Sequence, residues 1–246
     1  MQLLTSTGVN KSDYYSDTLF EFLLPFLRKQ KKIRSVFEIG TGRGYLSILL
    51  AKRFPSITSI LATDIDSTAI SLARKNVELN GLDGLIKVSR GSLFVPAGKK
   101  RFDLIFSVPP QLPLTKEYVR RLIPRVESYH VTTSAGGKDG RLIVDKIING
   151  ATSHLNPYGI LSFVHSDIIG LDKSLSKLES IGLRAILLGK KSILLKNTTL
   201  TRLSKKAIEK TGYRFKKNGK NQEVFEIGVI AGIYGQDSHQ EYRSLK

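Results

Sequence analysis

The sequence predicts a doubly wound α/β domain built on a mostly parallel, seven-stranded sheet. Short, nearly all-apolar runs, typical of buried strands, alternate with amphipathic stretches at helical spacing. Turn residues such as Pro55 and Asn80-Gly81 separate these runs. The 246 residues suffice for one large domain with a single core. A strand–helix alternation of this kind implies a parallel sheet with helices on both faces.

A lead-in helix is predicted first, because apolar residues recur at helical spacing between Leu19 and Leu27. The predicted strands are 35–39, 57–63, 85–88, 102–108, 160–164, 183–188 and 223–233. The predicted helices are 45–54, 67–79, 141–155 and 173–181, with a turn at 156–159 and a basic loop at 214–220. We expect residues 1–32 to form the lead-in, 33–189 the core, and 190–246 a basic C-terminal segment of the same domain.

The charge balance is unusual. The chain carries 39 lysines and arginines against 21 acids, a net charge of +18 and a pI near 10.0. Residues 182–246 alone hold 14 of these cations against five acids. Such an excess favours a polyanionic partner, so we expect contact with nucleic acid or with a ribosome-associated acceptor.

Composition also excludes several classes of protein. The absence of cysteine rules out disulfides, iron–sulfur clusters and thiolate zinc sites, and no metal site is expected from the four scattered histidines. No apolar run approaches the roughly 20 residues that span a bilayer. Residues 1–15 are polar and do not form a signal segment. We therefore expect a cytoplasmic protein that does not contact membranes.

The first chemical motif is a glycine-rich loop after the strand 35–39. Its residues Gly40-Thr41-Gly42-Arg43-Gly44 have the spacing G-x-G-x-G, whereas dinucleotide binders have G-x-G-x-x-G. Glu38 ends the strand and would repel a pyrophosphate. Its carboxylate could instead receive an ammonium group or tether the loop. The loop therefore suits a cationic ligand that lacks phosphate.

Two further strand ends carry candidate binding residues. Asp64 ends the second strand, where a carboxylate can accept both hydroxyls of a ribose. Asp66 is a rival for this role, although its place before Ser67 suits a helix start. After the third strand, Ser92 could bond the edge of an adenine while Leu93 packs on the ring.

Together these residues resemble the class I S-adenosylmethionine-dependent methyltransferases. More narrowly, they are similar to the release-factor glutamine methyltransferases and their methyltransferase small domain relatives. The resemblance covers residues 14–189 and rests on four segments. These are Tyr15-Ser16-Asp17-Thr18, the loop 38–44, the strand end 102–110, and Gly136-Gly137-Lys138-Asp139-Gly140, expected to form a mobile loop near the acceptor. It implies a Rossmann-like fold with S-adenosyl-L-methionine as cofactor.

The segment Ser107-Val108-Pro109-Pro110 departs from the family pattern. The family has Asn or Asp where this chain has Val108, and an aromatic residue where it has Gln111. Valine cannot accept a hydrogen bond from a target nitrogen. Three interpretations stay open. Backbone carbonyls could orient the acceptor with help from Gln111 or Ser107, the acceptor could be a thioether, carboxylate or ring nitrogen, or the chain could bind cofactor without catalysis.

We therefore predict a methyltransferase acting on a macromolecule, either RNA or a translation-related protein. The alternatives are a small-molecule methyltransferase with a thioether or carboxylate acceptor, and a non-catalytic cofactor-binding partner. A catalytic role for His165, His130 or another histidine is a weaker hypothesis than a structural one. The predicted catalytic residues are Ser107, Val108, Pro109 and Pro110; the predicted cofactor-binding residues are Thr18, Glu38, Gly40, Thr41, Gly42, Gly44, Asp64, Ile65, Ser92 and Leu93.

Overall fold

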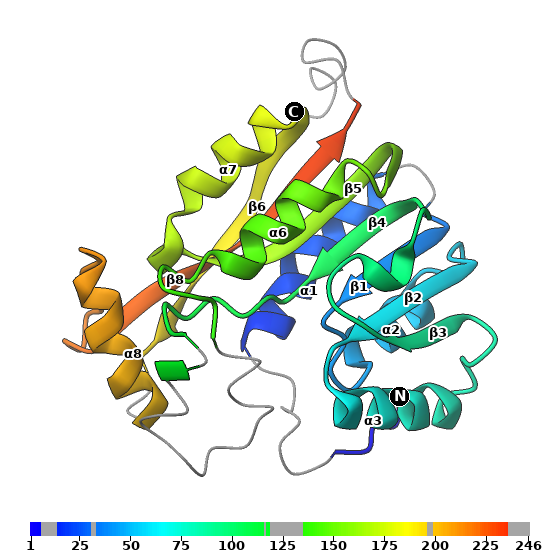
Figure 1. Ribbon diagram of the computed structural model, residues 1–246, viewed down its shortest axis with the longest axis horizontal. Coiled ribbons are helices and arrows are strands. Elements are labelled where there is room, and N and C mark those ends of the chain that lie inside the picture. Colours follow the sequence, from blue (N-terminus) through cyan, green and yellow to red (C-terminus); the bar gives the residue numbers. More distant parts are fainter. Residues whose placement is uncertain (6–13, 31–32, 116, 119–134, 196–198, 236–246) are drawn as a thin grey trace.

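A computed structural model describes residues 1–5, 14–30, 33–115, 117–118, 135–195 and 199–235. Its centre is one twisted sheet with the strand order β3-β2-β1-β4-β5-β8-β6 (Figure 1). A two-residue strand, β7, pairs with β8 outside this path. The predicted doubly wound, mostly parallel α/β fold is confirmed, with the short β7 added to the seven predicted strands.

The strands follow the predicted order along the chain. They are β1 (Ser35–Ile39), β2 (Ser59–Asp64), β3 (Ile86–Arg90), β4 (Phe102–Ser107), β5 (Leu155–Ser166), β6 (Leu183–Leu194), β7 (Lys216–Lys217) and β8 (Glu223–Tyr234). Strands β1 to β5 run parallel, and β8 is antiparallel to both β5 and β6. Because β8 lies between β5 and β6, the last strand of the described residues is built into the sheet. The expected boundary at residue 189 falls inside β6.

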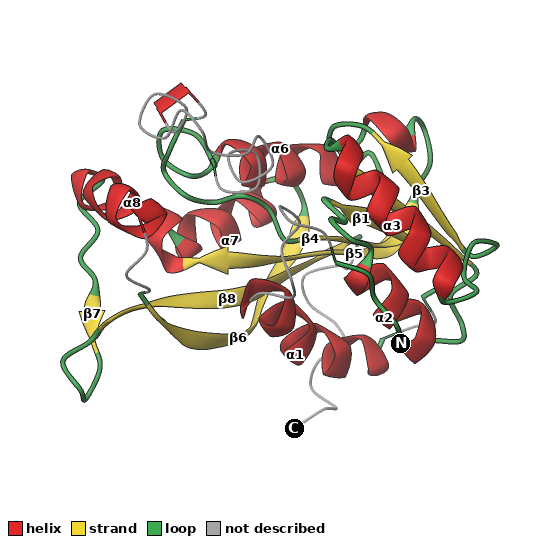
Figure 2. Cartoon of the chain, turned by 90° about the horizontal axis from the view of Figure 1, so that it is seen from below, coloured by secondary structure: helices red, strands yellow, loops and turns green. Residues whose placement is uncertain are grey.

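Helices cover both faces of the sheet. They are α1 (Tyr14–Arg28), α2 (Tyr45–Arg53), α3 (Ser67–Leu79), α6 (Leu142–Ala151), α7 (Leu171–Ser180) and α8 (Thr199–Lys210), with the short 3₁₀ turns η1 (Val95–Ala97) and η2 (Asp167–Ile169). Figure 2 shows α1 and α2 on one side of the sheet and α6 and α7 on the other. Two hydrophobic clusters fill the space between these layers and the sheet.

Side-chain alternation along β1 explains why both faces must be covered. Val36 points into the cluster under α1 and α2, whereas Phe37 points into the cluster under α6. Both side chains are fully buried. A strand with two apolar faces must lie inside a three-layer structure, since each exposed face would leave a large apolar area in water.

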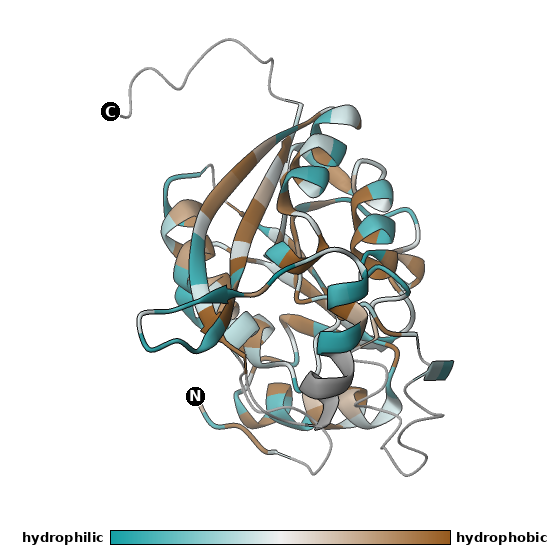
Figure 3. Ribbon diagram, turned by 90° about the vertical axis from the view of Figure 1, so that its left-hand side faces the viewer, coloured by the Kyte–Doolittle hydropathy of each residue, from teal (hydrophilic) through white to brown (hydrophobic). Residues whose placement is uncertain are grey.

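Two predicted loops were wrong in part. The turn expected at 156–159 lies within β5, where the register against β4 shifts and Tyr158 has a positive φ of 63°. The turn residues therefore form a bulge that leaves the strand continuous. The expected basic loop at 214–220 contains β7 and forms a hairpin with β8, which Figure 3 shows in hydrophilic colours.

Helix α8 was not predicted from the sequence. Five of its twelve residues are lysine or threonine, and its apolar residues recur at helical spacing: Leu200, Leu203, Ala207 and Ile208. None of the helices in the described ranges has the length and apolar character needed to cross a bilayer.

Candidate functional site

A cleft of about 1090 Å³ opens at the carboxyl ends of the parallel strands. Twelve of the fourteen predicted site residues line it, from the loops after β1, β2, β3 and β4. The two others do not. Thr18 is buried within α1, and Gly44 is the N-cap of α2 with a positive φ of 81°.

The glycine-rich loop makes its turn with positive φ angles. Gly40 has φ 81° and Gly42 has φ 55°, backbone conformations that L side chains rarely adopt. The loop's own N–H groups are occupied, because those of Gly40 and Thr41 both donate to the Thr63 carbonyl at 2.8 Å. The loop therefore does not offer these N–H groups to a phosphate, in agreement with its G-x-G-x-G spacing.

Glu38 lies beneath this loop with its side chain buried. One carboxylate oxygen accepts hydrogen bonds from the hydroxyls of Thr41, at 2.7 Å, and Ser47. Burial raises the pKa of Glu38 to about 7, against the effect of these bonds. Glu38 tethers the loop through side-chain hydroxyls, and its ionised form is costly unless a positive group comes close.

Asp64 ends β2 and faces the same cleft. Its carboxylate accepts hydrogen bonds from the backbone N–H of Gly42, at 2.9 Å, and from that of Asp66, at 3.0 Å. Burial raises the pKa of Asp64 above its usual value. The rival residue Asp66 caps α3 instead, accepting from the N–H groups of Thr68 and Ala69. The structure thus separates the two acids into a cleft residue and a helix cap.

The loop after β3 closes the side of the cleft next to Asp64. Ile65, Ser92 and Leu93 line it, and Ile65 is 39% exposed although it is a large apolar residue. Leu93 has a positive φ of 50°, a strained conformation for a branched side chain. Apolar side chains at Ile65 and Leu93, near the carboxylates of Asp64 and Glu38, suit a ligand with a flat ring joined to a sugar that carries hydroxyl groups.

The strand end after β4 is tied to the backbone around it. The Ser107 hydroxyl donates to the Ile39 carbonyl at 2.8 Å. The Gln111 amide donates to the carbonyls of Val164, at 2.8 Å, and Pro109, at 3.2 Å, and its oxygen accepts from Ser166 N–H at 2.7 Å. The side chains of Ser107 and Gln111 are therefore occupied by backbone groups, and half-buried Val108 lines the cleft beside them.

The glycine loop at 136–140 packs against the backbone of Gln111. A Cβ at Gly136 would come within 2.7 Å of the Gly140 carbonyl oxygen and 2.9 Å of the Gln111 Cα. Gly140 has φ +79°, and a Cβ there would collide with the Gln111 carbonyl. These glycines let the loop lie beside the strand end, and Gly137, Lys138 and Asp139 line the cleft.

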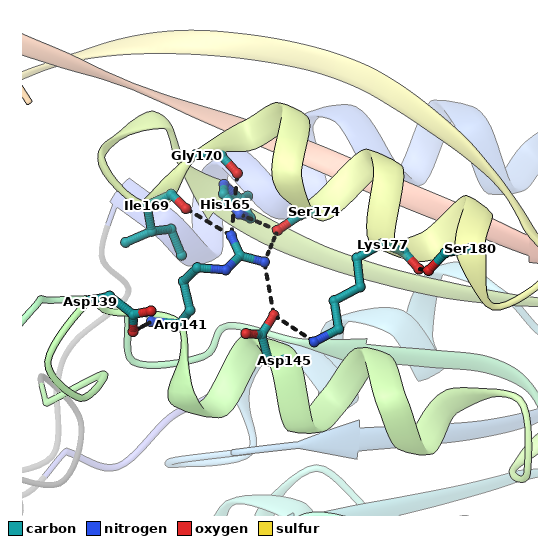
Figure 4. Close-up of polar contacts among 9 residues, drawn as sticks. All are labelled: Asp139, Arg141, Asp145, His165, Ile169, Gly170, Ser174, Lys177 and Ser180. Atoms are coloured by element: carbon teal, nitrogen blue, oxygen red, sulfur yellow. Dashed lines mark hydrogen bonds and ion pairs between the residues drawn. The ribbon is translucent and has the colours of Figure 1, made fainter.

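Arg141 fixes the end of this loop (Figure 4). Its buried guanidinium donates to the Ile169 carbonyl at 2.7 Å, to Asp145 at 2.8 Å and to the Ser174 hydroxyl at 3.0 Å. No sequence pattern indicated this network, because its members are spread over α6, η2 and α7.

His165 belongs to the same network and does not line the cleft. Its Nε2 lies 2.7 Å from the Ser174 hydroxyl, and burial together with the charge of Arg141 lowers its pKa to about 3. A neutral, enclosed imidazole of this kind is structural. The hypothesis on His130 concerns a residue outside the described ranges.

Several cleft residues were not predicted. Tyr15 and Ser16 of α1 line the cleft where Thr18 was expected, and Asp145, Lys146 and Asn149 of α6 line the opposite wall. The helical spacing of Asp145, Lys146 and Asn149 could have indicated a shared face, but no motif pointed to the cleft.

The chemistry of the cofactor-side residues fits S-adenosylmethionine better than a phosphate-bearing ligand. Two acids, Glu38 and Asp64, end neighbouring strands, and the loop between them has its N–H groups turned inward. Arg43 is the cation nearest in sequence, and its guanidinium stacks over the Tyr45 ring at 5.4 Å. Ammonium and hydroxyl groups suit the two carboxylates, while an anion would be repelled.

Comparison with known proteins agrees with this geometry. The profile of the methyltransferase small domain family matches residues 1–125. A ribosomal protein uL3 glutamine methyltransferase of Bradyrhizobium diazoefficiens is 37% identical over 127 residues, which are 52% of this chain and 39% of that protein. A release factor glutamine methyltransferase of Gloeobacter violaceus is 33% identical over 148 residues, which are 60% of this chain and 50% of that protein.

Among solved structures, the YcgJ protein from Bacillus subtilis superimposes with a TM-score of 0.58 at 12% identity. The match covers 87% of this chain and 97% of that one, and at this identity it shows the fold alone. The chain spans half or less of the length of the two glutamine methyltransferases. From the family profile and the cleft at the strand ends, the chain belongs to the methyltransferase small domain family.

Proposed function

We propose that the protein is an S-adenosylmethionine-dependent methyltransferase that acts on a protein of the translation machinery. The observation that carries the proposal is the pair of carboxylates, Glu38 and Asp64, on either side of a glycine loop whose N–H groups are internally bonded. When bound, the cofactor supplies an electrophilic methyl group. The names of the glutamine methyltransferase relatives support a protein acceptor.

Each predicted cofactor residue has a proposed task. Glu38 would accept the ammonium group of the cofactor, and Asp64 its ribose hydroxyls. Ile65, Ser92 and Leu93 would surround the adenine. Gly40, Thr41 and Gly42 bring the backbone close to the ligand, whereas Thr18 and Gly44 contribute through packing. The proposal assigns no metal.

The acceptor would enter beside Val108, Pro109 and Pro110. Because Gln111 and Ser107 are held by backbone groups, they position the strand end and do not contact the acceptor directly. Backbone carbonyls would then orient the acceptor atom, and positioning can supply a large share of the rate. This favours the interpretation in which backbone carbonyls orient the acceptor despite Val108. In it, Gln111 and Ser107 help by holding the backbone in place.

Val108 also motivates a second candidate function, methylation of a small molecule through a thioether or carboxylate. Such an acceptor needs no hydrogen-bond acceptor at position 108. A Val108→Asn change distinguishes the two. A gain of activity on amide acceptors, together with native inactivity on small molecules, would eliminate the second candidate.

The proposal can be tested with methyl-labelled S-adenosylmethionine and a cell extract, followed by ribonuclease or protease on parallel samples. Label released by protease is expected. Release by ribonuclease would make RNA the acceptor, and label in small molecules would support the second candidate. No label, with cofactor binding confirmed, would indicate a non-catalytic binding protein. The names of these relatives give proteins as acceptors. We therefore propose that the expected contact with nucleic acid serves to hold the enzyme near its acceptor, and that nucleic acid is not the methylated molecule.

A further inference from the structure

A group of exposed cations lies on the segment after β6. Residues 205–222, which we call the basic arm, comprise the described side chains of α8, the following turn and the hairpin around β7. Six of its basic side chains are exposed: Lys216, which pairs with Glu226, and the five cations Lys206, Lys210, Arg214, Lys217 and Lys220. The function proposed above uses none of them.

The basic arm is fixed to the domain next to the cleft. Ala207 packs on Leu114 in a small apolar cluster with Leu112, and Leu112 lines the cleft. The Tyr213 hydroxyl donates to both carboxylate oxygens of Asp167, each at 2.9 Å, and Asp167 directly follows β5. The arm is therefore positioned at the same edge of the sheet as the cleft.

The acidic side chains near the basic arm form ion pairs with Lys205 and Lys216, which are not among the five cations. Glu223 pairs with Lys205 at 2.6 Å, and Glu226 pairs with Lys216 at 2.9 Å. Glu209 lies 3.8 Å from Lys205. Within the described ranges, these five cations form no ion pair; the Arg214 guanidinium donates to the backbone carbonyls of Glu209 and Tyr213, neutral groups that leave its charge uncompensated. A positive field therefore lies next to the cleft.

The cations are spread over a helix and a hairpin. Lys206, Lys210 and Arg214 border a surface hollow of about 430 Å³ that Glu209 also lines. Lys217 ends β7 and Lys220 lies in the turn of the hairpin, which is strongly hydrophilic in Figure 3. Such a distribution matches an extended polyanion with regularly spaced charges better than a single carboxylate.

The apolar side chains of the basic arm argue against a membrane surface. Ile208 is buried, and Tyr213 and Phe215 are half-buried and contact each other edge to face. An interfacial membrane helix needs apolar side chains free to enter the lipid. Among the described residues of the arm, no large apolar side chain is exposed.

We propose that the basic arm binds the phosphate backbone of RNA and holds it beside the cleft. An acceptor protein carried on that RNA would then be presented to the strand ends. The binding itself is independent of the enzymatic activity, while its effect on methyl transfer rests on the proposed function. The arm would add affinity through charge without reading sequence.

The test is fluorescence anisotropy with a fluorescein-labelled 20-nucleotide RNA hairpin at 50 to 300 mM KCl. The first variant, K206Q/K210Q/R214Q, removes the three cations around the hollow. Each phosphate contact contributes roughly 0.7 to 0.9 to the slope of log affinity against log salt, so the slope should fall by about 2. Over this sixfold salt range a slope difference of about 2 changes the affinity ratio by roughly 36-fold, so affinity at the lowest salt should fall by at least about 40-fold. K217Q/K220Q removes two cations outside α8, so its slope should fall by about two-thirds as much, and it guards against misfolding of the helix.

The matched control is K52Q/K99Q/K100Q, which removes three exposed cations from the opposite edge of the sheet. It should keep RNA affinity within about twofold of the native protein. An equal loss in the control would overturn the proposal, since binding would then follow net charge. Tighter binding to phosphatidylserine vesicles or to polyglutamate than to RNA would also overturn it.

Cofactor binding, measured by calorimetry on the same variants, separates this proposal from the proposed function. The arm variants should bind S-adenosylmethionine like the native protein. If the arm variants bind cofactor and also bind RNA as tightly as the native protein does, only the RNA-binding role is refuted. Native protein that binds RNA through the arm but does not bind cofactor would refute only the proposed function.

Discussion

Glu38 should make the stability of the protein depend on pH. Its buried carboxyl has a pKa of about 7, raised from 4.5 mainly by loss of water. Between these values the folded state binds a proton more strongly than the unfolded state. The contribution of Glu38 to stability is therefore full below pH 4.5 and is lost as the pH rises through 7.

The size of this effect follows from the shift. A difference of about 2.5 pH units corresponds to about 3 kcal/mol, at 1.36 kcal/mol per unit. Glu38→Gln removes the titration, while the amide oxygen can still accept bonds from Thr41 and Ser47. Any constant cost of the new amide cancels, because the measured quantity is the change of the stability difference with pH.

The assay is urea unfolding of both proteins from pH 5 to pH 8.5 without cofactor. The stability of Glu38→Gln relative to the native protein should rise by about 1.4 kcal/mol per pH unit up to pH 7 and then level off. Glu78→Gln, at an exposed position of α3, controls for the loss of one negative charge. A stability difference for Glu38→Gln that stays constant with pH would refute the reasoning.

Three further predictions concern the cleft and its supports. Asp64→Ala should weaken S-adenosylmethionine binding by about 2 to 3 kcal/mol in calorimetry, because hydrogen bonds to a charged group are lost, and unchanged affinity would show that Asp64 does not hold the ribose. Arg141→Lys should lower the free energy of unfolding by about 2 kcal/mol, as measured by urea unfolding. The reason is that an ammonium group cannot reproduce the planar set of hydrogen bonds to Ile169, Asp145 and Ser174. Gly140→Ala should cost at least about 1 to 2 kcal/mol, because the residue has φ +79° and its Cβ meets the Gln111 carbonyl; a circular dichroism melt unaffected by the change would contradict this account.

The sequence predicted the cofactor side of the cleft better than the acceptor side. Glu38, Gly42 and Asp64 lie within one strand–loop–helix–strand unit, where local spacing determines which side chains meet. The apolar runs also located every main strand, although β5 begins five residues before the predicted start and β6 ends six residues after the predicted end. These features are local, and local patterns are what a single sequence expresses most directly.

The elements that the sequence did not reveal depend on distant contacts. Helix α8 carries Leu200, Leu203, Ala207 and Ile208 at helical spacing, a local signal that the prediction missed, and Lys205 in it pairs with Glu223 at the start of β8. The residues predicted as a turn at 156–159 form a bulge within β5, because β5 pairs with β4 on both sides of them. Arg141 meets Ser174 only after α6 and α7 have packed together. None of these partners is near in sequence, so spacing alone could not indicate them.

Titration of the native protein with S-adenosylmethionine in a calorimeter, at pH 8 where Glu38 is mostly ionised, tests the central claim most directly. One cofactor should bind per chain, with affinity lowered by at least about thirtyfold in Asp64→Ala. The affinity should also weaken as the pH falls below 7 in the native protein more than in Glu38→Gln, since a protonated Glu38 cannot hold an ammonium group. Absence of binding, or equal binding by native protein and Asp64→Ala, would contradict the assignment of this cleft as a cofactor site.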